Sequence, residues 1–248
     1  MSSTDPITTP VDIACVIHSE GYDWIYVEKL YSMLERHCKR PFWLHVYTEP
    51  IRPVASPLVK HNLVEWAGVA GPRRSWWYKM QLFNPANHQG PLLYFDLDVI
   101  ITRPIDWIWQ LDLAHFWAAK DFRRIFRPNR QELNSSVMYW DTRQYSWVWE
   151  EFKKNNLMQI IRNFSGDQDF LNSVLPPDKL AFFDVAKVQS FRWEIKDGGL
   201  DPRKRTYRAP NSGAKLGSET SVIVFHGRPK PHEVQDFLIN RLWNAELE

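Results

Sequence analysis

Residues 91–102 read PLLYFDLDVIIT, a largely apolar run that is interrupted by two acidic residues, Asp96 and Asp98. Pro91 and Pro104 bound the run, which predicts a β-strand that is buried on both faces. Alternate side chains of a strand point to the same side, so both carboxylates can face one object. If the strand ends close to them, they stand at its carboxyl end, where open α/β sheets hold their ligands.

Two carboxylates in an otherwise dry segment need partners. Burying one ionised carboxylate costs several kcal/mol of folding free energy unless another group neutralises it. A divalent cation neutralises two carboxylates at once, and its free positions then accept phosphate oxygens. The alternative is a pair of strand-end aspartates that accept hydrogen bonds from loop amides, and the Asp-x-Asp pattern alone does not separate the two.

The length of 248 residues is enough for one large domain or for two closely packed ones. We expect a single domain over residues 1–248, with a disordered tail at 1–10 and a long basic loop at 198–217. Charged residues make up 24% and hydrophobic residues 44% of the chain, which is typical of a soluble globular protein. The net charge of +2 argues against a nucleic-acid partner that is bound by bulk positive charge.

The chain also carries little sign of a membrane or secreted location. No apolar run reaches the roughly 18 to 20 residues of a transmembrane helix, and the N-terminus lacks a signal pattern, although peripheral membrane contact stays open. Two cysteines, Cys15 and Cys38, make no disulfide framework and favour the reducing cytoplasm. The 13 tryptophans can serve core packing or stacking on sugar rings and bases, and composition does not separate these uses.

The residues before the Asp-x-Asp stretch predict a β-α-β unit. Strands are expected at 11–18 and 42–47, with an amphipathic helix from Trp24 to Leu34 between them. This alternation is typical of a parallel sheet that is covered by helices. A further short strand is expected at 63–66. Ser75 is then expected to cap a short helix that runs to Phe83 and presents Lys79, which could reach a phosphate.

Further strands and helices are expected after the Asp-x-Asp stretch. Strands are predicted at 116–119, 133–140, 185–193 and 221–227, and helices around 145–152 and 166–172. The last of these strands runs into His226. Residues 198–217 read as a loop of a length that is usually functional or disordered.

Together these segments resemble nucleotide-sugar glycosyltransferases of the GT-A fold, above all the retaining family 8, which includes glycogenin and bacterial lipopolysaccharide galactosyl- and glucosyltransferases. Four stretches carry the resemblance in the family's order: DLD at 96–98, LNSSVM at 133–138, DQDFLN at 167–172, and FHG at 225–227 with Lys230-Pro231. The resemblance implies an α/β fold with one Rossmann-like domain, a mainly parallel mixed sheet flanked by helices. It also implies transfer of a sugar from a nucleoside diphosphate sugar, preferably a UDP-sugar, to a glycan or lipid-linked acceptor with retention.

The resemblance also implies roles for individual residues. Asp96, Asp98 and His226 would hold Mn²⁺ or Mg²⁺, and the histidine nitrogen favours Mn²⁺. Asp167 and Gln168 would face the donor sugar as catalytic residues. The donor and its diphosphate would contact His18, Tyr22, Lys79, Asp96, Asn134, Ser135, Gly227 and Lys230. The speculative acceptor contacts are Arg203, Lys204, Arg205 and Arg208, although such a charge run is usually a solvated face.

Three departures from the family pattern concern the donor. His226-Gly227-x-x-Lys230 is tighter than the usual His-x-x-Gly-x-x-Lys, and Ser136 stands where glycine is common. Residues 18–22 lack an acidic residue at the position that often contacts the uracil ring in this family. These departures leave the donor base and the donor sugar open, but they do not change the expected reaction class.

Asp167 is expected at a helix start, where the helix dipole would lower the pKa of its carboxyl. Such a group suits the stabilisation of positive charge at the anomeric carbon better than general-base catalysis. The alternative is that Asp167 only caps its helix.

Two other functions fit parts of the sequence. A haloacid-dehalogenase-like phosphatase would use Asp96 as nucleophile and Asp98 as general acid, but its motif normally opens the domain, whereas a β-α-β unit precedes it here. A non-catalytic module that binds sugar or protein would use the tryptophans for stacking.

Overall fold

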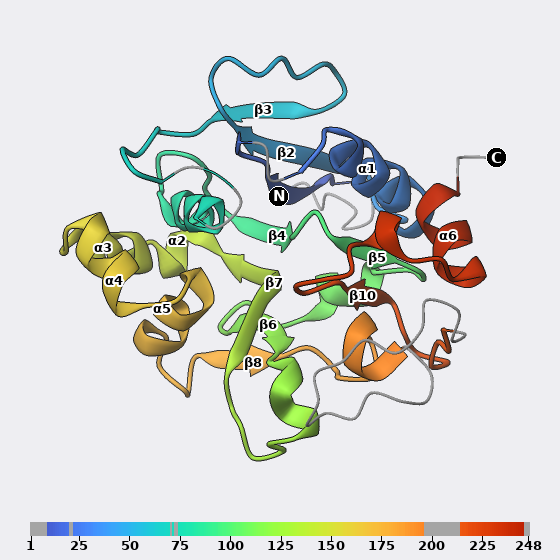
Figure 1. Cartoon of the computed structure of the whole chain (residues 1–248). Coiled ribbons are helices and arrows are strands. Elements are labelled where there is room, and N and C mark those ends of the chain that lie inside the picture. Colours follow the sequence, from blue (N-terminus) through green and yellow to red (C-terminus); the bar gives the residue numbers. More distant parts are fainter. Residues whose placement is uncertain (1–8, 20–21, 70, 72–73, 196–213, 246–248) are drawn as a thin grey trace, which may run out of the picture.

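The computed structural model describes residues 9–19, 22–69, 71, 74–195 and 214–245. A seven-stranded sheet with the order β3-β2-β1-β4-β7-β6-β8 forms its centre (Figure 1). β7 runs antiparallel to both of its neighbours, and the other six strands share one direction. The predicted α/β class with a mainly parallel mixed sheet is therefore confirmed. The strands are β1 (Val11–Val16), β2 (Phe42–Thr48), β3 (Val59–Asn62), β4 (Pro91–Phe95), β6 (Phe116–Lys120), β7 (Leu133–Asp141) and β8 (Leu180–Phe182).

A smaller sheet has the order β5-β10-β9, from Val99–Ile101, Val222–Val224 and Val188–Ser190. Residues 91–102 are therefore two strands in two sheets, and the expectation of one strand is wrong. The backbone explains the break: the amide of Asp96 still donates to the carbonyl of Ser136 on β7 at 2.8 Å, whereas the carbonyl of Asp98 accepts from the amide of Phe225 after β10 at 3.0 Å. The Asp-x-Asp motif is the turn between the two sheets.

The helices gather in two groups on the two sides of the large sheet (Figure 1). Strand alternation creates two cores: Ile13 and Cys15 of β1 join one, and Ala14 between them joins the other. The first core includes α1, α6 and the small sheet, and the second includes η2 and α3 to α5. The α-helices are α1 (Ile25–His37), α2 (Thr142–Tyr145), α3 (Trp147–Lys153), α4 (Leu157–Asn163), α5 (Asp167–Val174) and α6 (Phe237–Asn244). Shorter turns are η2 (Ser75–Phe83), η3 (Asp106–Gln110), η4 (Phe122–Ile125), the π-helical η5 (Phe191–Ile195) and η6 (Pro231–Glu233).

Two expected strands differ from the structure. Residues 63–66 form no strand, because the side chain of Gln81 accepts a hydrogen bond from the amide of Val64 at 2.9 Å and donates one to its carbonyl at 2.8 Å. The parallel strand in this region is β3, which ends just before these residues. Residues 185–193 form a strand only over β9, because a turn after Asp184 precedes it and η5 follows it. The strand β8 and the helices α4 and α6 were not expected from the sequence.

Ser75 does not cap η2 as expected. The amides of Arg74 and Ser75 both donate to the carbonyl of Gly71, at 3.3 and 3.2 Å, so the turn begins earlier and Arg74 takes the N-cap position. Lys79 nevertheless lies on this element as expected.

Several expectations fall partly or wholly outside the described residues. These are the tail at 1–10, of which only 9 and 10 are described, and the basic loop at 198–217, of which only 214–217 are described. The four acceptor candidates Arg203, Lys204, Arg205 and Arg208 lie in the undescribed part. Within the described residues, no helix has both the length and the apolar character that a membrane span needs. Cys15 and Cys38 are buried and unpaired, and the cytoplasmic location stays a prediction.

Candidate active site

A cavity of about 430 Å³ opens where β1 and β4 end side by side. The chain continues from β1 to β2 on one side, while β4 lies on the other side, so this is a switch point of the sheet, where ligands of open α/β folds bind. The volume is in the range of small-molecule sites. Most of the residues that the sequence predicted for the site line it: His18, Tyr22, Lys79, Asp96, Asp98, Ser135, Asp167, Gln168, His226, Gly227 and Lys230.

Lys79 joins the Asp-x-Asp motif to α5. Its buried Nζ lies 3.1 Å from Oδ1 of Asp96 and 3.1 Å from Oδ2 of Asp167, and it donates a hydrogen bond to Oγ of Ser135 at 3.2 Å. Burial opposes the charge of Lys79, but the carboxylates of Asp167 and Asp96 outweigh it, so the pKa of Lys79 is raised. The ammonium is therefore a fixed positive charge at the floor of the site.

The two aspartates of the motif have different partners. Oδ1 of Asp96 also accepts from the hydroxyl of Tyr94 at 2.7 Å; burial raises the pKa of Asp96, but Lys79, Tyr94 and Ser136 lower it more. Oδ2 of Asp98 accepts from the hydroxyl of Tyr22 at 2.9 Å and pairs with Nζ of Lys230. Burial raises the pKa of Asp98 despite Lys230.

Asp167 departs from the expected electrostatics. Its pKa is raised, because burial outweighs both Lys79 and the hydrogen bond from Ser135, so the expectation of a lowered pKa is wrong. Asp167 does not cap α5 either. Gly166 takes the N-cap position without a side-chain bond, and a Cβ there would come within 3.2 Å of Nε1 of Trp76. The Asp167 carboxylate instead faces Lys79 in the cavity.

Gln168 is held by a short chain of amide contacts. Nδ2 of Asn134 donates to Oε1 of Gln168 at 3.0 Å, and Nε2 of Gln168 donates to Oδ2 of Asp121 at 3.3 Å. Gln168 lines the cavity, whereas Asn134 does not and positions Gln168 from behind. The strand β7 and the helix α5 thus meet at the pair of residues that the sequence had placed next to the donor sugar.

His226 is brought to the same cavity from the segment after β10. Its Nε2 lies 2.7 Å from Oγ of Ser190, and its ring stacks on Phe122 with centroids 5.1 Å apart. Burial lowers the pKa of His226 to about 4, helped by nearby cations such as Arg192, so the ring is neutral at pH 7. The hydrogen bond between Phe225 and Asp98 ties this segment to the Asp-x-Asp motif across the sequence.

The donor set of Asp96, Asp98 and His226 fits a manganese ion in kind, since two carboxylates and a neutral imidazole line one cavity. Their ligand atoms are not drawn together, because lysines pair with the aspartates and Ser190 with the histidine. In the part of the chain that the structure describes, the one group of three ligand atoms within 4.8 Å of one another is Asp12, His45 and His88, outside this cavity.

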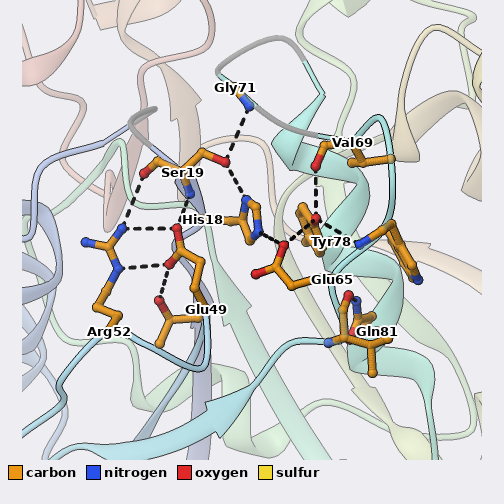
Figure 2. A network of polar contacts seen from close by, with 12 residues as sticks. His18, Ser19, Glu49, Arg52, Glu65, Val69, Gly71, Tyr78 and Gln81 are labelled. Carbon is orange, nitrogen blue, oxygen red and sulfur yellow. Dashed lines mark hydrogen bonds and ion pairs between the residues drawn. The ribbon is translucent and has the colours of Figure 1, made fainter.

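His18 belongs to a network of polar contacts beside the cavity (Figure 2). Its ring stacks on Tyr78 with centroids 3.8 Å apart, and its Nε2 lies 3.1 Å from Oε2 of Glu65. The backbone amide of Ser19 donates to Glu49, which also pairs with Arg52 at 2.9 Å. The segments that follow β2 and β3 thus supply the acidic side chains of Glu49 and Glu65 to the turn after β1. This turn lacks an acidic residue at the position where the family often carries one.

Sequence reasoning missed several residues of the site. Tyr94 precedes Asp96 by two positions, so strand alternation could have placed it on the same side. Asp121 lies two residues after the expected strand at 116–119 and directly follows β6, at a carboxyl end where functional groups gather. Ser190 and Glu65 carry no local signal.

No family model and no curated protein matches the sequence. Solved structures do resemble it. The galactosyltransferase LgtC in complex with donor and acceptor sugar analogs has a TM-score of 0.60 and 13% identity over 96% of this chain and 97% of that one. The glycosyltransferase GlyE of Streptococcus pneumoniae TIGR4 has a TM-score of 0.66 and 15% identity over 94% and 60%. Mouse xyloside xylosyltransferase 1 has a TM-score of 0.53 and 13% identity over 88% and 98%. The chain therefore has the fold of these glycosyltransferases, as the GT-A resemblance predicted.

Proposed function

We propose that this chain is a glycosyltransferase that moves a sugar from a nucleoside diphosphate sugar, preferably a UDP-sugar, to a glycan or lipid-linked acceptor with retention of the anomeric configuration. The observation that carries the proposal is the cavity at the sheet's switch point, where the buried carboxylates of Asp98 and Asp167, the partly exposed carboxylate of Asp96, two lysines and a neutral histidine meet in a glycosyltransferase fold. This set of groups suits a ligand that combines a sugar with a charged diphosphate.

The lysines account for the leaving group. Breaking the bond between the sugar and the diphosphate builds negative charge on the diphosphate oxygens. A charged group aimed at such a site commonly lowers the barrier by about 3 to 4 kcal/mol. Lys230 is the better placed of the two, because it is partly exposed and pairs with one carboxylate of the described residues, that of Asp98, whereas Lys79 is buried between two carboxylates.

The balance of charge supports a Mn²⁺ or Mg²⁺ ion held by Asp96, Asp98 and His226. Among the residues that the structure describes, Lys79 and Lys230 are the ammonium partners of Asp96, Asp98 and Asp167. The raised pKa values of Asp98 and Asp167 reflect carboxylates that these lysines do not fully compensate. Bound there, the cation would supply positive charge to the diphosphate oxygens as the sugar departs.

Asp167 and Gln168 are the proposed contacts to the transferred sugar. Asp167 presents a carboxylate that Lys79 holds in place, which suits it to stabilise positive charge at the anomeric carbon. Gln168, oriented by Asn134 and Asp121, offers an amide to the sugar hydroxyls. The basic residues Arg203, Lys204, Arg205 and Arg208 remain the proposed acceptor contacts, on the sequence alone.

A panel of sugar nucleotides tests the proposal. The full chain is incubated with each donor and Mn²⁺, and release of nucleoside diphosphate is measured with and without excess chelator. We expect release from one donor, loss of release in chelator, and recovery that is greatest with Mn²⁺. Asp98→Asn should lose most of this activity, while Asp112→Asn, at an exposed aspartate, should keep it. Full activity in chelator would overturn the metal dependence.

The same assay separates the phosphatase alternative. A nucleophilic Asp96 would attack with its Oδ2, because its Oδ1 is engaged by both Tyr94 and Lys79. Phosphate release from simple phosphate esters, without diphosphate release from any sugar nucleotide, would replace the transferase proposal with the phosphatase.

A further inference from the structure

A second cluster of ligand-type side chains lies outside the candidate active site. It consists of Asp12 near the start of β1, His45 on β2, His61 on β3 and His88 in the loop that precedes β4. Asp12 is at the amino end of β1, whereas the cavity residue His18 follows its carboxyl end. None of the four lines the cavity, so the proposed transfer reaction leaves this cluster without a role.

Three of these residues converge closely enough to share one ion. Ligand atoms of Asp12, His45 and His88 all lie within 4.8 Å of one another. Oδ1 of Asp12 is 2.8 Å from Nε2 of His45, and Oδ2 of Asp12 is 3.8 Å from Nε2 of His88. Two ligands on a tetrahedral zinc ion, each bonded at about 2.0 to 2.2 Å, lie about 3.3 to 3.5 Å apart. The observed distance from Asp12 to His45 is shorter than this range, and the distance from Asp12 to His88 is longer.

The residue types also suit a metal. A metal ion binds imidazole in its neutral form and a carboxylate in its ionised form. Histidine and aspartate side chains offer these forms near neutral pH.

His61 gives the cluster an outer contact. Its Nε2 lies 2.8 Å from Nδ1 of His45, and its ring stacks on Tyr47 with centroids 4.4 Å apart. A histidine that binds a metal through Nε2 usually donates its Nδ1–H to an acceptor that fixes the ring. A neutral His61 can be that acceptor for His45.

We propose that Asp12, His45 and His88 form a zinc site, with His61 as the positioning residue for His45. Two imidazoles and one carboxylate suit Zn²⁺, whereas Mg²⁺ and Ca²⁺ prefer oxygen ligands throughout. The side chain of Asp12 is 34% exposed, so an ion can enter from solvent. The three ligands come from β1, β2 and the loop before β4, and the ion therefore links these segments.

Metal titration of the full chain tests the site. Metal-free protein is titrated with Co²⁺, followed by its visible absorption, and with Zn²⁺, followed by calorimetry and thermal unfolding. We expect Zn²⁺ to displace Co²⁺ and to raise the melting temperature by several degrees, since a ligand that binds only the folded state stabilises it. The candidate active site also offers nitrogen and oxygen ligands, so the titration is repeated with Asp98→Asn, which should still bind one zinc ion through Asp12, His45 and His88. This remaining binding separates the two sites.

Variants locate the ion. His88→Gln and Asp12→Asn should weaken Zn²⁺ binding at least about tenfold, and His61→Gln should weaken it about tenfold through His45. His115→Gln is the matched control, because His115 also faces an aspartate at 3.8 Å but lies outside the cluster. Near-ultraviolet circular dichroism of the metal-free variants checks that they are folded. If His88→Gln is unfolded, the test rests on Asp12→Asn, which keeps the size and shape of the side chain. Absence of Co²⁺ and Zn²⁺ binding to the wild-type chain, or unchanged binding in Asp12→Asn, would overturn the proposal.

Discussion

Asp167 separates catalytic from structural effects at the scale of single residues. Its raised pKa shows that the charged carboxylate is costly to bury, so Asp167→Asn should leave the melting temperature nearly unchanged. If the charge stabilises the transition state, turnover should fall at least about tenfold, which corresponds to about 1.4 kcal/mol of barrier. Steady-state kinetics and thermal unfolding measure both effects. Asp178→Asn, at an exposed position beyond α5, is the control. Unchanged turnover in Asp167→Asn would remove Asp167 from the chemistry.

Lys79 should behave in the opposite way. Lys79→Met keeps the length of the side chain but leaves the buried carboxylate of Asp167 and the partly exposed carboxylate of Asp96 without their shared cation. Breaking a buried pair in this manner costs about 3 to 5 kcal/mol, which urea unfolding at pH 7 would detect. Lys154→Met is the control, because its pair with Glu151 is exposed and worth less than about 1 kcal/mol. Adding Asp167→Asn to Lys79→Met should recover part of the loss, and a loss no larger than that of the control would contradict this account.

At the scale of elements, the end of β2 carries an acid-sensitive contact (Figure 2). The pKa of Glu49 is lowered to about 2 from 4.5; burial opposes this, but Arg52 and Thr48 outweigh it. The unfolded chain therefore binds a proton at Glu49 between about pH 4.5 and pH 2 while the folded chain does not, so this stability is present above pH 4.5 and is lost as the pH falls through that window.

Glu49→Gln tests this contact. It should lower the free energy of unfolding at pH 7 by about 1 to 2 kcal/mol, a value reduced for the partial exposure of Arg52. The difference from wild type should shrink toward pH 3, where urea unfolding is compared with that at pH 7. Glu151→Gln, in an exposed pair, should show little difference at either pH. A difference that stays constant with pH would mean that the Glu49 side chain contributes by packing and not by charge.

At the scale of the whole molecule, the stereochemistry of the proposed reaction tests the family-8 resemblance. An inverting enzyme needs a general base with a pKa near neutrality beside the acceptor. The family-8 resemblance favours retention, and Asp96, Asp98 and Asp167 are each paired with a lysine, which disfavours these three as general bases. We therefore expect nuclear magnetic resonance of the product to show the anomeric configuration of the donor. An inverted product would contradict the family-8 resemblance even if the metal dependence holds.

The fold class and many of the residues that line the cavity could be predicted from the sequence. Apolar alternation indicated β1, β2, β4, β6, β7 and β10, and helical spacing indicated α1, because these patterns report which side of an element is buried. Strand ends are local features too, and for that reason His18 and Asp96 could each be placed at the carboxyl end of a strand, whereas only the family resemblance joined His226 to them.

The tertiary structure alone decided which of these groups meet and what state they are in. Lys79 pairs with Asp167, and Lys230 with Asp98, through contacts that no local pattern encodes. The raised pKa of Asp167 and the break between β4 and β5 likewise depend on segments that are distant in the sequence. Periodicity tells a residue's burial relative to its own element, whereas pairing, desolvation and sheet membership depend on segments far away in the sequence. The cluster of Asp12, His45, His61 and His88 is joined from four such segments, and packing alone brings them together.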